Sequence, residues 1–344
     1  MLSSDELSLK LEKTSINSTF ESSIIAHWSL NSSPSFEYWN PSLSFDQISS
    51  LLNCLVLNVD KSKLPKLKSS LPKLITLSPY VKIVSPECKP NLLFLILSIL
   101  YKNKSDTSSE QSLLKSLNSF DIFIPRNRLN AICKEFISED WEIFASKPYI
   151  SSPLFIDRIK SYETNPGSIG MLFESNIIDK EYHRSYVSQK VVIGNISIAC
   201  TGEIDCFDDE TILEVKSRPA WAKSNDSRIH DNWVQSKLAG VDYILTGSFN
   251  SVGNTNRGPV AFKTSDFERL SLNEYANKVK DKTSAFEYCE DVLCTILKSC
   301  KDVGVVYHIT GRRGKPCTIS KCKNQFAIDQ VVVENCVKVI MNIP

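Results

Sequence analysis

Residues 202–217 read GEIDCFDDETILEVKS, and this stretch decides the fold. Two short, mainly apolar segments flank an acidic turn, and between them they carry Glu203, Asp205, Glu214 and Lys216. Side chains alternate across a β-strand, so the two polar residues of each segment share a face. The stretch therefore predicts two strands whose polar groups lie on one side of a sheet.

Closing the turn over residues 208–211 fixes the register of this hairpin. Asp205 then lies opposite Glu214, and Glu203 lies opposite Lys216. All four polar side chains share one face in that register. The other face carries Ile204, Cys206, Leu213 and Val215.

Two opposed carboxylates repel, so Asp205 and Glu214 weaken the hairpin unless a partner balances them. Hard oxygen ligands suit Mg²⁺ or Mn²⁺, and a divalent cation is the natural partner. Lys216 beside them could balance charge and orient a water. From these residues alone, a solvated sheet face with ordinary surface charges stays an alternative.

The order of these residues is that of a nuclease core. An acid, a short gap and then E-x-K on the next strand resemble the restriction-endonuclease-like core, in which such residues hold metal against a scissile phosphate. A mixed α/β sheet flanked by helices is the fold that this resemblance implies.

Further blocks resemble the decapping exoribonuclease (DXO) family, which acts on RNA 5′ ends. The resemblance covers roughly residues 120–340. In chain order, the matching blocks are PRNRL (125–129) with Arg126, GMLFE (170–174) with Glu174, GEIDC (202–206) with Glu203 and Asp205, LEVKS (213–217) with Glu214 and Lys216, and WVQSKLAGV (233–241) with Gln235. The linker FDDETIL is shorter than is usual in the family, and Ser217 stands where threonine is common.

The resemblance implies a role for each residue. Glu174, Asp205 and Glu214 would ligate Mg²⁺ or Mn²⁺, with two ions expected and the Val215 carbonyl as a further ligand. Glu203 would act through a water on the metal or through the substrate. Lys216 and Gln235 would contact the nucleophilic water and the scissile phosphate. Arg126 would bind another phosphate of the substrate. Glu203, Asp205, Glu214 and Lys216 are the expected catalytic residues.

Simpler interpretations remain for single residues. The position of Arg126 also fits an ordinary solvated arginine just before a helix. Trp233 is expected in the core rather than as a platform for base stacking, and Tyr186 as a strand-face tyrosine. The loop GRRGK (311–315) fits a solvated turn as well as a basic RNA contact.

The expected function is therefore a metal-dependent hydrolase of RNA 5′ ends. By resemblance, its substrates are incomplete or unconventional ends: NAD caps, unmethylated caps and 5′-triphosphates. Some family members then degrade RNA in the 5′→3′ direction. The alternatives are a DNA nuclease on the same core and a non-catalytic partner that stabilises a larger 5′→3′ exoribonuclease.

The composition of the chain disfavours several other classes of protein. The chain has 344 residues, a formal net charge of +1 and eleven cysteines without a C-x-x-C pair, which disfavours a zinc site and a disulfide framework. The apolar run LLFLILSILY (92–101) is too short to span a bilayer. We expect an intracellular protein of the nucleus or cytoplasm, with RNA 5′ ends as its partner and no membrane.

The distribution of glycine predicts the domain organisation. All eleven glycines lie between Gly167 and Gly314, so helices and loops are expected before them and tight β-turns after them. We expect an N-terminal region over 1–120 packed on a nuclease core over 121–344. Expected helices include 46–56, 91–102, 109–118, 127–146 and one region over 271–300, and a Gly194-Asn195 turn joins two strands.

Overall fold

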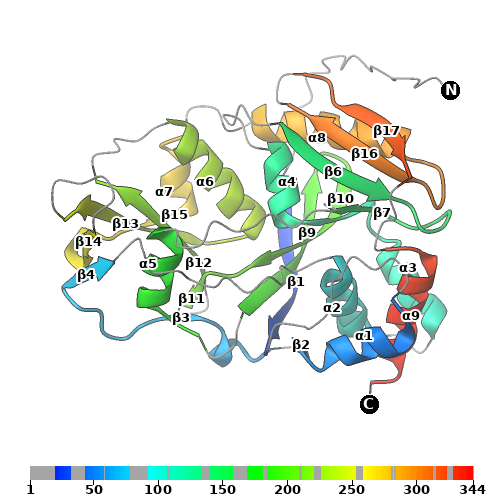
Figure 1. Cartoon of the computed structure of the whole chain (residues 1–344), viewed down its shortest axis with the longest axis horizontal. Helices are drawn as coiled ribbons and strands as arrows, with labels where there is room; N and C mark the ends of the chain where they lie inside the picture. The colour runs from blue at the N-terminus through cyan, green and yellow to red at the C-terminus, as the bar shows by residue number, and fades with distance from the viewer. Residues whose placement is uncertain are drawn as a thin grey trace.

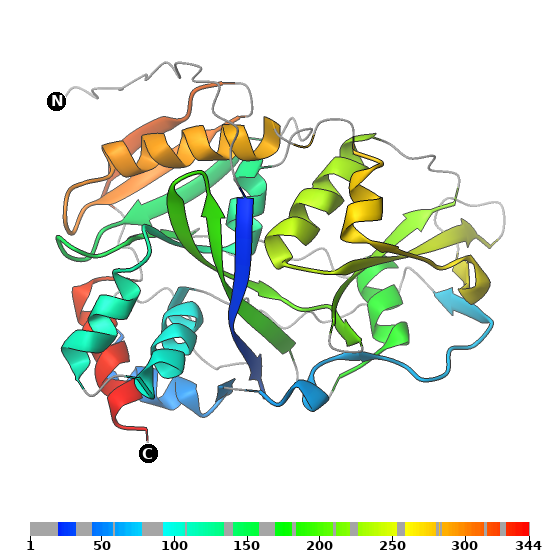
Figure 2. The ribbon, with the colours of Figure 1, turned by 180° about the vertical axis from the view of Figure 1, so that it is seen from behind.

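The computed structural model describes residues 20–31, 43–57, 59–77, 92–106, 109–133, 140–157, 169–180, 184–208, 211–220, 226–252, 259–279, 282, 284–312, 315–323 and 328–343. Within these ranges, strands form two large mixed sheets and one small pair. Figures 1 and 2 show the smaller of the two sheets with its helices at one end of the molecule and a helical group near the C-terminus at the other.

Nine described strands form the larger sheet. Their order across it is β17 (Thr318–Cys322), β16 (Val306–Gly311), β6 (Trp141–Ser146), β7 (Leu154–Asp157), β5 (Ile122–Pro125), β10 (Ile196–Glu203), β9 (Arg184–Ile193), β1 (Phe20–Leu30) and β2 (Leu55–Leu57). β5 is parallel to both β7 and β10, whereas β9 is antiparallel to β10 and to β1. The predicted mixed sheet is therefore confirmed.

The six-stranded sheet contains the second half of the acidic stretch. Its described members are β11 (Cys206–Asp208), β12 (Thr211–Pro219), β13 (Tyr243–Ser251), β14 (Val260–Lys263) and β4 (Leu74–Leu77), with β15 (Glu268–Ser271) paired to β13. β12 and β13 are parallel. A separate pair joins β3 (Lys66–Leu67) to β8 (Ile178–Asp179).

Helices cover both faces of the larger sheet. One face packs in a cluster with α1 (Phe45–Leu52), α2 (Leu92–Lys104), α3 (Glu110–Leu117) and α9 (Gln330–Met341). The other packs with α4 (Arg126–Cys133), α6 (Asp226–Ala239), α7 (Leu272–Ala276) and α8 (Ser284–Ser299). α5 (Ile169–Ile177) packs on the six-stranded sheet. Short 3₁₀ turns occupy Lys61–Lys63 and Thr264–Asp266.

The local sequence accounts for several of these elements. Leu92 to Leu100 are all buried, because α2 is a core helix without a polar side over that length. Gly194 has φ of +58° in the predicted two-residue turn between β9 and β10, a conformation that costs glycine little. Within the described ranges, each helix is too short or too polar to span a bilayer.

Several predicted elements differ from the structure. The helix expected over 127–146 ends at Cys133, and Trp141–Ser146 form β6 instead. This strand is buried on both faces, because Ile143 packs in the α4/α6/α8 cluster and Phe144 in the α2/α9 cluster, so its pattern lacks the alternation that marks a half-buried strand. The region over 271–300 divides into α7 and α8.

The expectation of helices and loops before residue 167 is wrong for the seven described strands β1 to β7. β1 pairs with β9 along its whole length, from Phe20 opposite Ile193 to Leu30 opposite Arg184. Glycine-poor strands joined by long connections contain no tight turn to reveal them. The helix expected over 46–56 also stops at Leu52, and Leu55–Leu57 form β2.

Candidate active site

The acidic stretch forms the junction between the two large sheets. β10 ends at Glu203, and β11 begins at Cys206 in the other sheet. Ile204 and Asp205 lie between the two strands and connect them. The stretch is therefore a corner from one sheet into the next, which places one acid at the end of each sheet.

The predicted register of the hairpin is confirmed for β11 and β12. Cys206 pairs with Leu213, and Asp208 with Thr211. Asp205 lies just beyond this ladder, and its Oδ2 accepts a hydrogen bond from the backbone N–H of Val215 at 3.0 Å. Residues 209 and 210 of the turn lie outside the described residues.

The predicted pairing of Glu203 with Lys216 is wrong. Glu203 pairs with Tyr186 in β9, because β10 still belongs to the larger sheet at this point. The four apolar residues of the opposite face are all buried as predicted, but Ile204 packs in a different cluster from Cys206, Leu213 and Val215. The change of sheet at the corner separates them.

Glu214 is the buried centre of a polar contact group. Its side chain is 2% exposed, and its Oε1 accepts hydrogen bonds from Lys216 Nζ at 2.5 Å and from Gln235 Nε2 at 2.7 Å. Glu214 and Lys216 share a face of β12, and α6 brings Gln235 over that face. The structure thus brings together three of the residues that the sequence singled out.

Electrostatic interactions connect Glu174 of α5 to the same group. Burial, followed by the charge of Asp205, raises the pKa of Glu174 to about 8. Burial and the charge of Glu214 raise the pKa of Asp205 to about 7. These carboxyls therefore hold protons near neutral pH in the absence of a cation.

Glu214 and Lys216 form the ionised pair of the cluster. Burial opposes ionisation of Glu214, but Lys216 and Arg126 outweigh it and lower its pKa. Burial likewise favours a neutral Lys216, but Glu214 and Asp205 outweigh it and raise the pKa of Lys216. Glu214 is thus ionised beside the Lys216 ammonium, whereas the raised pKa values of Glu174 and Asp205 oppose their ionisation near neutral pH.

Arg126 is buried rather than solvated, which contradicts the surface interpretation. It is 9% exposed and begins α4, and its Nη2 donates to the backbone carbonyl of Glu203 at 2.9 Å. A Cβ at Gly202 would lie 2.4 Å from Arg126 Nε, so a larger residue there would force the arginine side chain to move. The glycine of the GEID block therefore makes room for this arginine.

Arg184 belongs to the site, although sequence reasoning missed it. Its Nη1 lies 3.1 Å from Glu203 Oε2, with side chains 13% and 33% exposed respectively. Since Glu203 pairs with Tyr186, Arg184 is its diagonal neighbour on the same face of β9. The Gly194-Asn195 turn fixes the register of β9 and β10, and this register would have predicted the contact between Arg184 and Glu203.

Two aromatic residues that could have contacted RNA are instead buried in the protein. Trp233 is 5% exposed and packs edge-on against Phe286 at 5.8 Å, which confirms the core prediction. Tyr186 is fully buried, stacked on Trp28 at 4.3 Å. In the loop at 311–315, residues 313 and 314 lie outside the described residues.

The donor set suits a hard divalent cation, although its side chains are not arranged around one. Among the described residues, no three acid, histidine or cysteine side chains converge closely enough to hold a metal ion. Glu214 Oε1 is already taken by Lys216 and Gln235. Glu174 and Asp205 are buried acids whose pKa values are raised, and their oxygen donors suit a cation that would replace their protons. Binding would require these carboxylates to reorient.

Comparison with a family of known proteins supports a nuclease fold. Residues 178–335 match the model of a family described as RAI1-like PD-(D/E)XK nuclease. The matched segment contains all four expected catalytic residues, Glu203, Asp205, Glu214 and Lys216, and also Gln235, whereas Glu174 lies just before it. No curated protein sequence is a significant match to the chain.

Solved structures of fungal proteins share the architecture. S. pombe Rai1 in complex with 3′-FADP has a TM-score of 0.65 at 14% identity, covering 93% of this chain and 100% of that one. Candida albicans Rai1 in complex with pU5 and Mn²⁺ has a TM-score of 0.62 at 15% identity, with coverages of 97% and 99%. K. lactis Dxo1 in complex with manganese has a TM-score of 0.57 at 13% identity, with coverages of 93% and 96%. At such identities the likeness shows the fold.

Proposed function

We propose that the chain is a metal-dependent hydrolase of RNA 5′ ends, an activity class that agrees with the match of residues 178–335 to the RAI1-like PD-(D/E)XK nuclease model. Its substrates would be ends that lack a complete methylated cap: NAD-capped, unmethylated-cap and 5′-triphosphate RNA. The relatives whose structures contain 3′-FADP or pU5 with Mn²⁺ support this substrate class.

The single observation that carries the proposal is the buried cluster around Glu214. Glu214 and Lys216 form a buried ionised pair where the two sheets join, and the carboxyls of Glu174 and Asp205, whose pKa values are raised, interact electrostatically with this group. Such a cluster is costly for a protein that uses it only structurally, because buried charges lose hydration. A cation and a substrate phosphate would together satisfy it.

Glu174, Asp205 and Glu214, with the Val215 carbonyl, are the residues that would hold Mg²⁺ or Mn²⁺. When bound by these residues, a divalent cation would supply Lewis acidity toward a phosphoryl oxygen and would lower the pKa of a water near neutral pH. The chain itself contributes the rigid β12 strand, on which Glu214 and Lys216 are two residues apart. This spacing fixes the position of the lysine relative to the Glu214 carboxylate.

The remaining polar residues would orient the substrate. Lys216 would stabilise negative charge that develops on the scissile phosphate, and Gln235 would orient the water through its amide. Arg126 would bind a neighbouring phosphate with its planar fork of donors. Arg184 would hold the Glu203 carboxylate in place, since it already contacts it at 3.1 Å.

Product analysis on RNAs that differ only at the 5′ end tests the proposal. The RNAs carry an NAD cap, an unmethylated cap, a methylated cap, a triphosphate, a monophosphate or a hydroxyl. We expect the first two and the triphosphate to release their end groups in Mn²⁺, and the methylated cap to react more slowly. Equal hydrolysis of all six would contradict end recognition, and hydrolysis of DNA in place of RNA would favour a DNA nuclease.

A further inference from the structure

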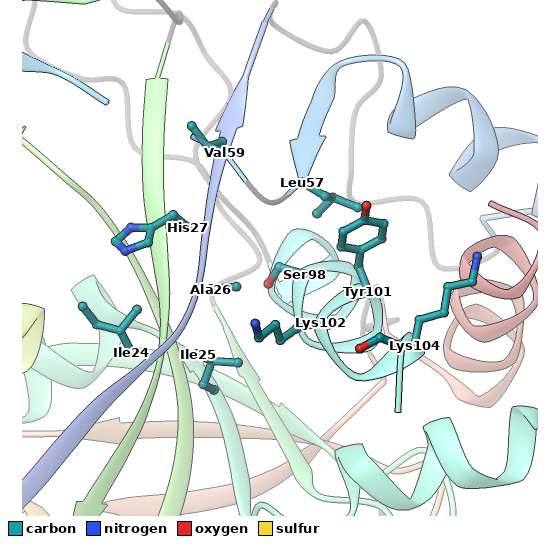
Figure 3. Close-up of a pocket in the computed structure, with 11 residues that line it drawn as sticks. Ile24, Ile25, Ala26, His27, Leu57, Val59, Ser98, Tyr101, Lys102 and Lys104 are labelled. Atoms are coloured by element: carbon teal, nitrogen blue, oxygen red, sulfur yellow. The ribbon is translucent and has the colours of Figure 1, made fainter. Parts of the chain in front are cut away.

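A cavity of about 530 Å³ lies at the edge of the nine-stranded sheet. None of the candidate active-site residues lines it. It is bounded by β1, by the chain around β2 and by the C-terminal half of α2, as Figure 3 shows. The side chains that matter here are Ile25, Ala26, Leu57, Ser98, Tyr101 and Lys102.

The cavity exists because the sheet is incomplete on this side. β2 pairs with β1 only from Trp28 to Leu30. Beyond that point, the backbone bond from Val59 N–H to the His27 carbonyl at 3.4 Å continues the contact. On this side of β1, no described strand pairs with residues 24–26, whereas β9 pairs with them on the other side. The space next to β1 is closed instead by the last turns of α2.

The walls of the cavity are apolar and its charge is positive. Ile25, Leu57 and Tyr101 are partly buried against the α2/α9 cluster. No lining residue is acidic. Figure 3 shows the Lys102 ammonium directed toward β1, beside Ser98. Within the part of the chain that the structure describes, Lys102 forms no ion pair, whereas Lys104 donates to the Ile343 carbonyl.

The floor of the cavity is held by a buried hydrogen-bond network. Ser98 is 1% exposed, and its Oγ lies 2.6 Å from Ser188 Oγ, which also accepts from Trp28 Nε1 at 3.0 Å. Trp28 is in turn stacked on Tyr186. A floor with its polar groups satisfied keeps its shape without a ligand, as most small-molecule sites do.

We infer that this cavity is a second ligand site, which binds a small organic anion with an apolar body. The anionic group, a carboxylate, sulfonate or phosphate, pairs with Lys102, and the body lies between Ile25, Leu57 and Tyr101. The volume falls within the range of about 300–1,000 Å³ in which proteins bind small molecules. The site is independent of the proposed nuclease activity.

Two larger kinds of occupant fit the cavity less well. An RNA strand carries a phosphate at each nucleotide and requires several cations along its path, whereas one unpaired ammonium is present among the described lining residues. An added peptide strand requires a regular edge, and the register of β1 shifts between Ile24 and Ala26. A compact anion needs neither feature.

Binding of 8-anilino-1-naphthalenesulfonate to the full chain, measured by fluorescence titration and equilibrium dialysis, tests the inference. N-phenyl-1-naphthylamine serves as the matched neutral probe, because it keeps the aromatic body and lacks the sulfonate. We expect one site that prefers the anion at least tenfold. Lys102→Glu should weaken the anion at least tenfold and leave the neutral probe unchanged, while Lys115→Glu, on the exposed side of α3, should change neither.

Ala26→Leu provides the second variant. The Ala26 side chain lies between β1 and Ser98 in Figure 3, so a leucine there fills the cavity and should abolish binding of both probes. If that variant fails to fold by circular dichroism, Lys102→Glu still decides. Unchanged anion binding by Lys102→Glu would overturn the inference. Displacement of the probe by an equimolar RNA oligonucleotide would also overturn it and assign the cavity to nucleic acid.

Discussion

Gln235 Nε2 and Lys216 Nζ both donate to the same oxygen, Oε1 of Glu214, at 2.7 and 2.5 Å. A helix and a strand thus share one buried acceptor at the junction of the two sheets. With both donors on one oxygen, Glu214 is fixed in orientation. Changes at any of the three residues should therefore affect the other two.

Glu214→Gln should reduce RNA hydrolysis at least a thousandfold and also destabilise the fold. It removes the charge that balances Lys216, and breaking a buried pair costs about 3–5 kcal/mol when the partner is left unpaired. Because the Lys216 side chain is 21% exposed, we expect about 1–3 kcal/mol by urea denaturation. Relief of repulsion alone would instead predict higher stability. Glu214→Gln with Lys216→Met should recover part of the loss, and no recovery would contradict the pairing.

Metal affinity should rise steeply between pH 6 and pH 8.5. The pKa values of Asp205 and Glu174, about 7 and about 8, mean that both carboxyls must lose protons before they bind a cation. Calorimetry of Mn²⁺ binding at pH 7 in buffers with different ionisation enthalpies should show proton release. An observed enthalpy that is the same in every buffer would contradict it.

The metal-free protein should lose stability as pH rises from about 4 to about 8. The folded pKa of each carboxyl is raised above its unfolded value, so the folded state holds protons that the unfolded state releases, and stability falls over that window. Thermal unfolding against pH, with Asp205→Asn as the matched variant, measures this. The variant should show a smaller loss. Mn²⁺ at about a hundredfold excess over its Kd should restore about 2.7 kcal/mol at pH 8.

Gly202→Ala should weaken RNA binding by the same route as Arg126→Ala. A Cβ at residue 202 would displace the Arg126 guanidinium, since it would lie 2.4 Å from Nε. A charge-assisted phosphate contact contributes roughly 1.5–3 kcal/mol, so affinity should fall about ten- to a hundredfold in either variant. The double variant should be no weaker than Arg126→Ala. Additive losses in filter-binding measurements would show that the two residues act separately.

Arg184→Met should lower kcat about tenfold with little change in KM, because Arg184 positions the Glu203 carboxylate through their ion pair. Arg184→Lys should recover part of kcat, since a cation remains within reach. Lys321→Met is the control, because its ion pair with Asp302 is exposed and lies on the edge strand β17 of the larger sheet. A rise in KM alone would instead make Arg184 a substrate-binding residue.

Much of the site could be predicted from the sequence because its residues lie close together along one strand pair. Alternation along residues 211–217 is enough to place Glu214 and Lys216 on one face. Local pattern could not show that the chain changes sheet at Ile204, since a corner and a continuous strand have the same alternation. The predicted partner of Glu203 was wrong for that reason.

Tertiary contacts explain the other differences. The burial of Arg126 depends on the absence of a side chain at Gly202, which lies 76 residues away in the sequence. The Arg184–Glu203 contact follows from the register of β9 and β10, and the turn at Gly194 fixed that register in advance. β6 reads as part of a helix because both of its faces are buried, and burial on two sides is decided by other parts of the chain.

Hydrolysis of a linear RNA and of a circular RNA of the same sequence tests the central claim most directly. The linear RNA carries a labelled 5′-triphosphate, and both are incubated with the purified protein in Mn²⁺, with chelator, and with the Asp205→Asn, Glu214→Gln double variant. We predict that the wild type releases the labelled end only with metal, that the double variant releases none, and that the circular RNA stays intact. Circular RNA cut as fast as linear RNA, or end release that persists after chelation, would contradict the account.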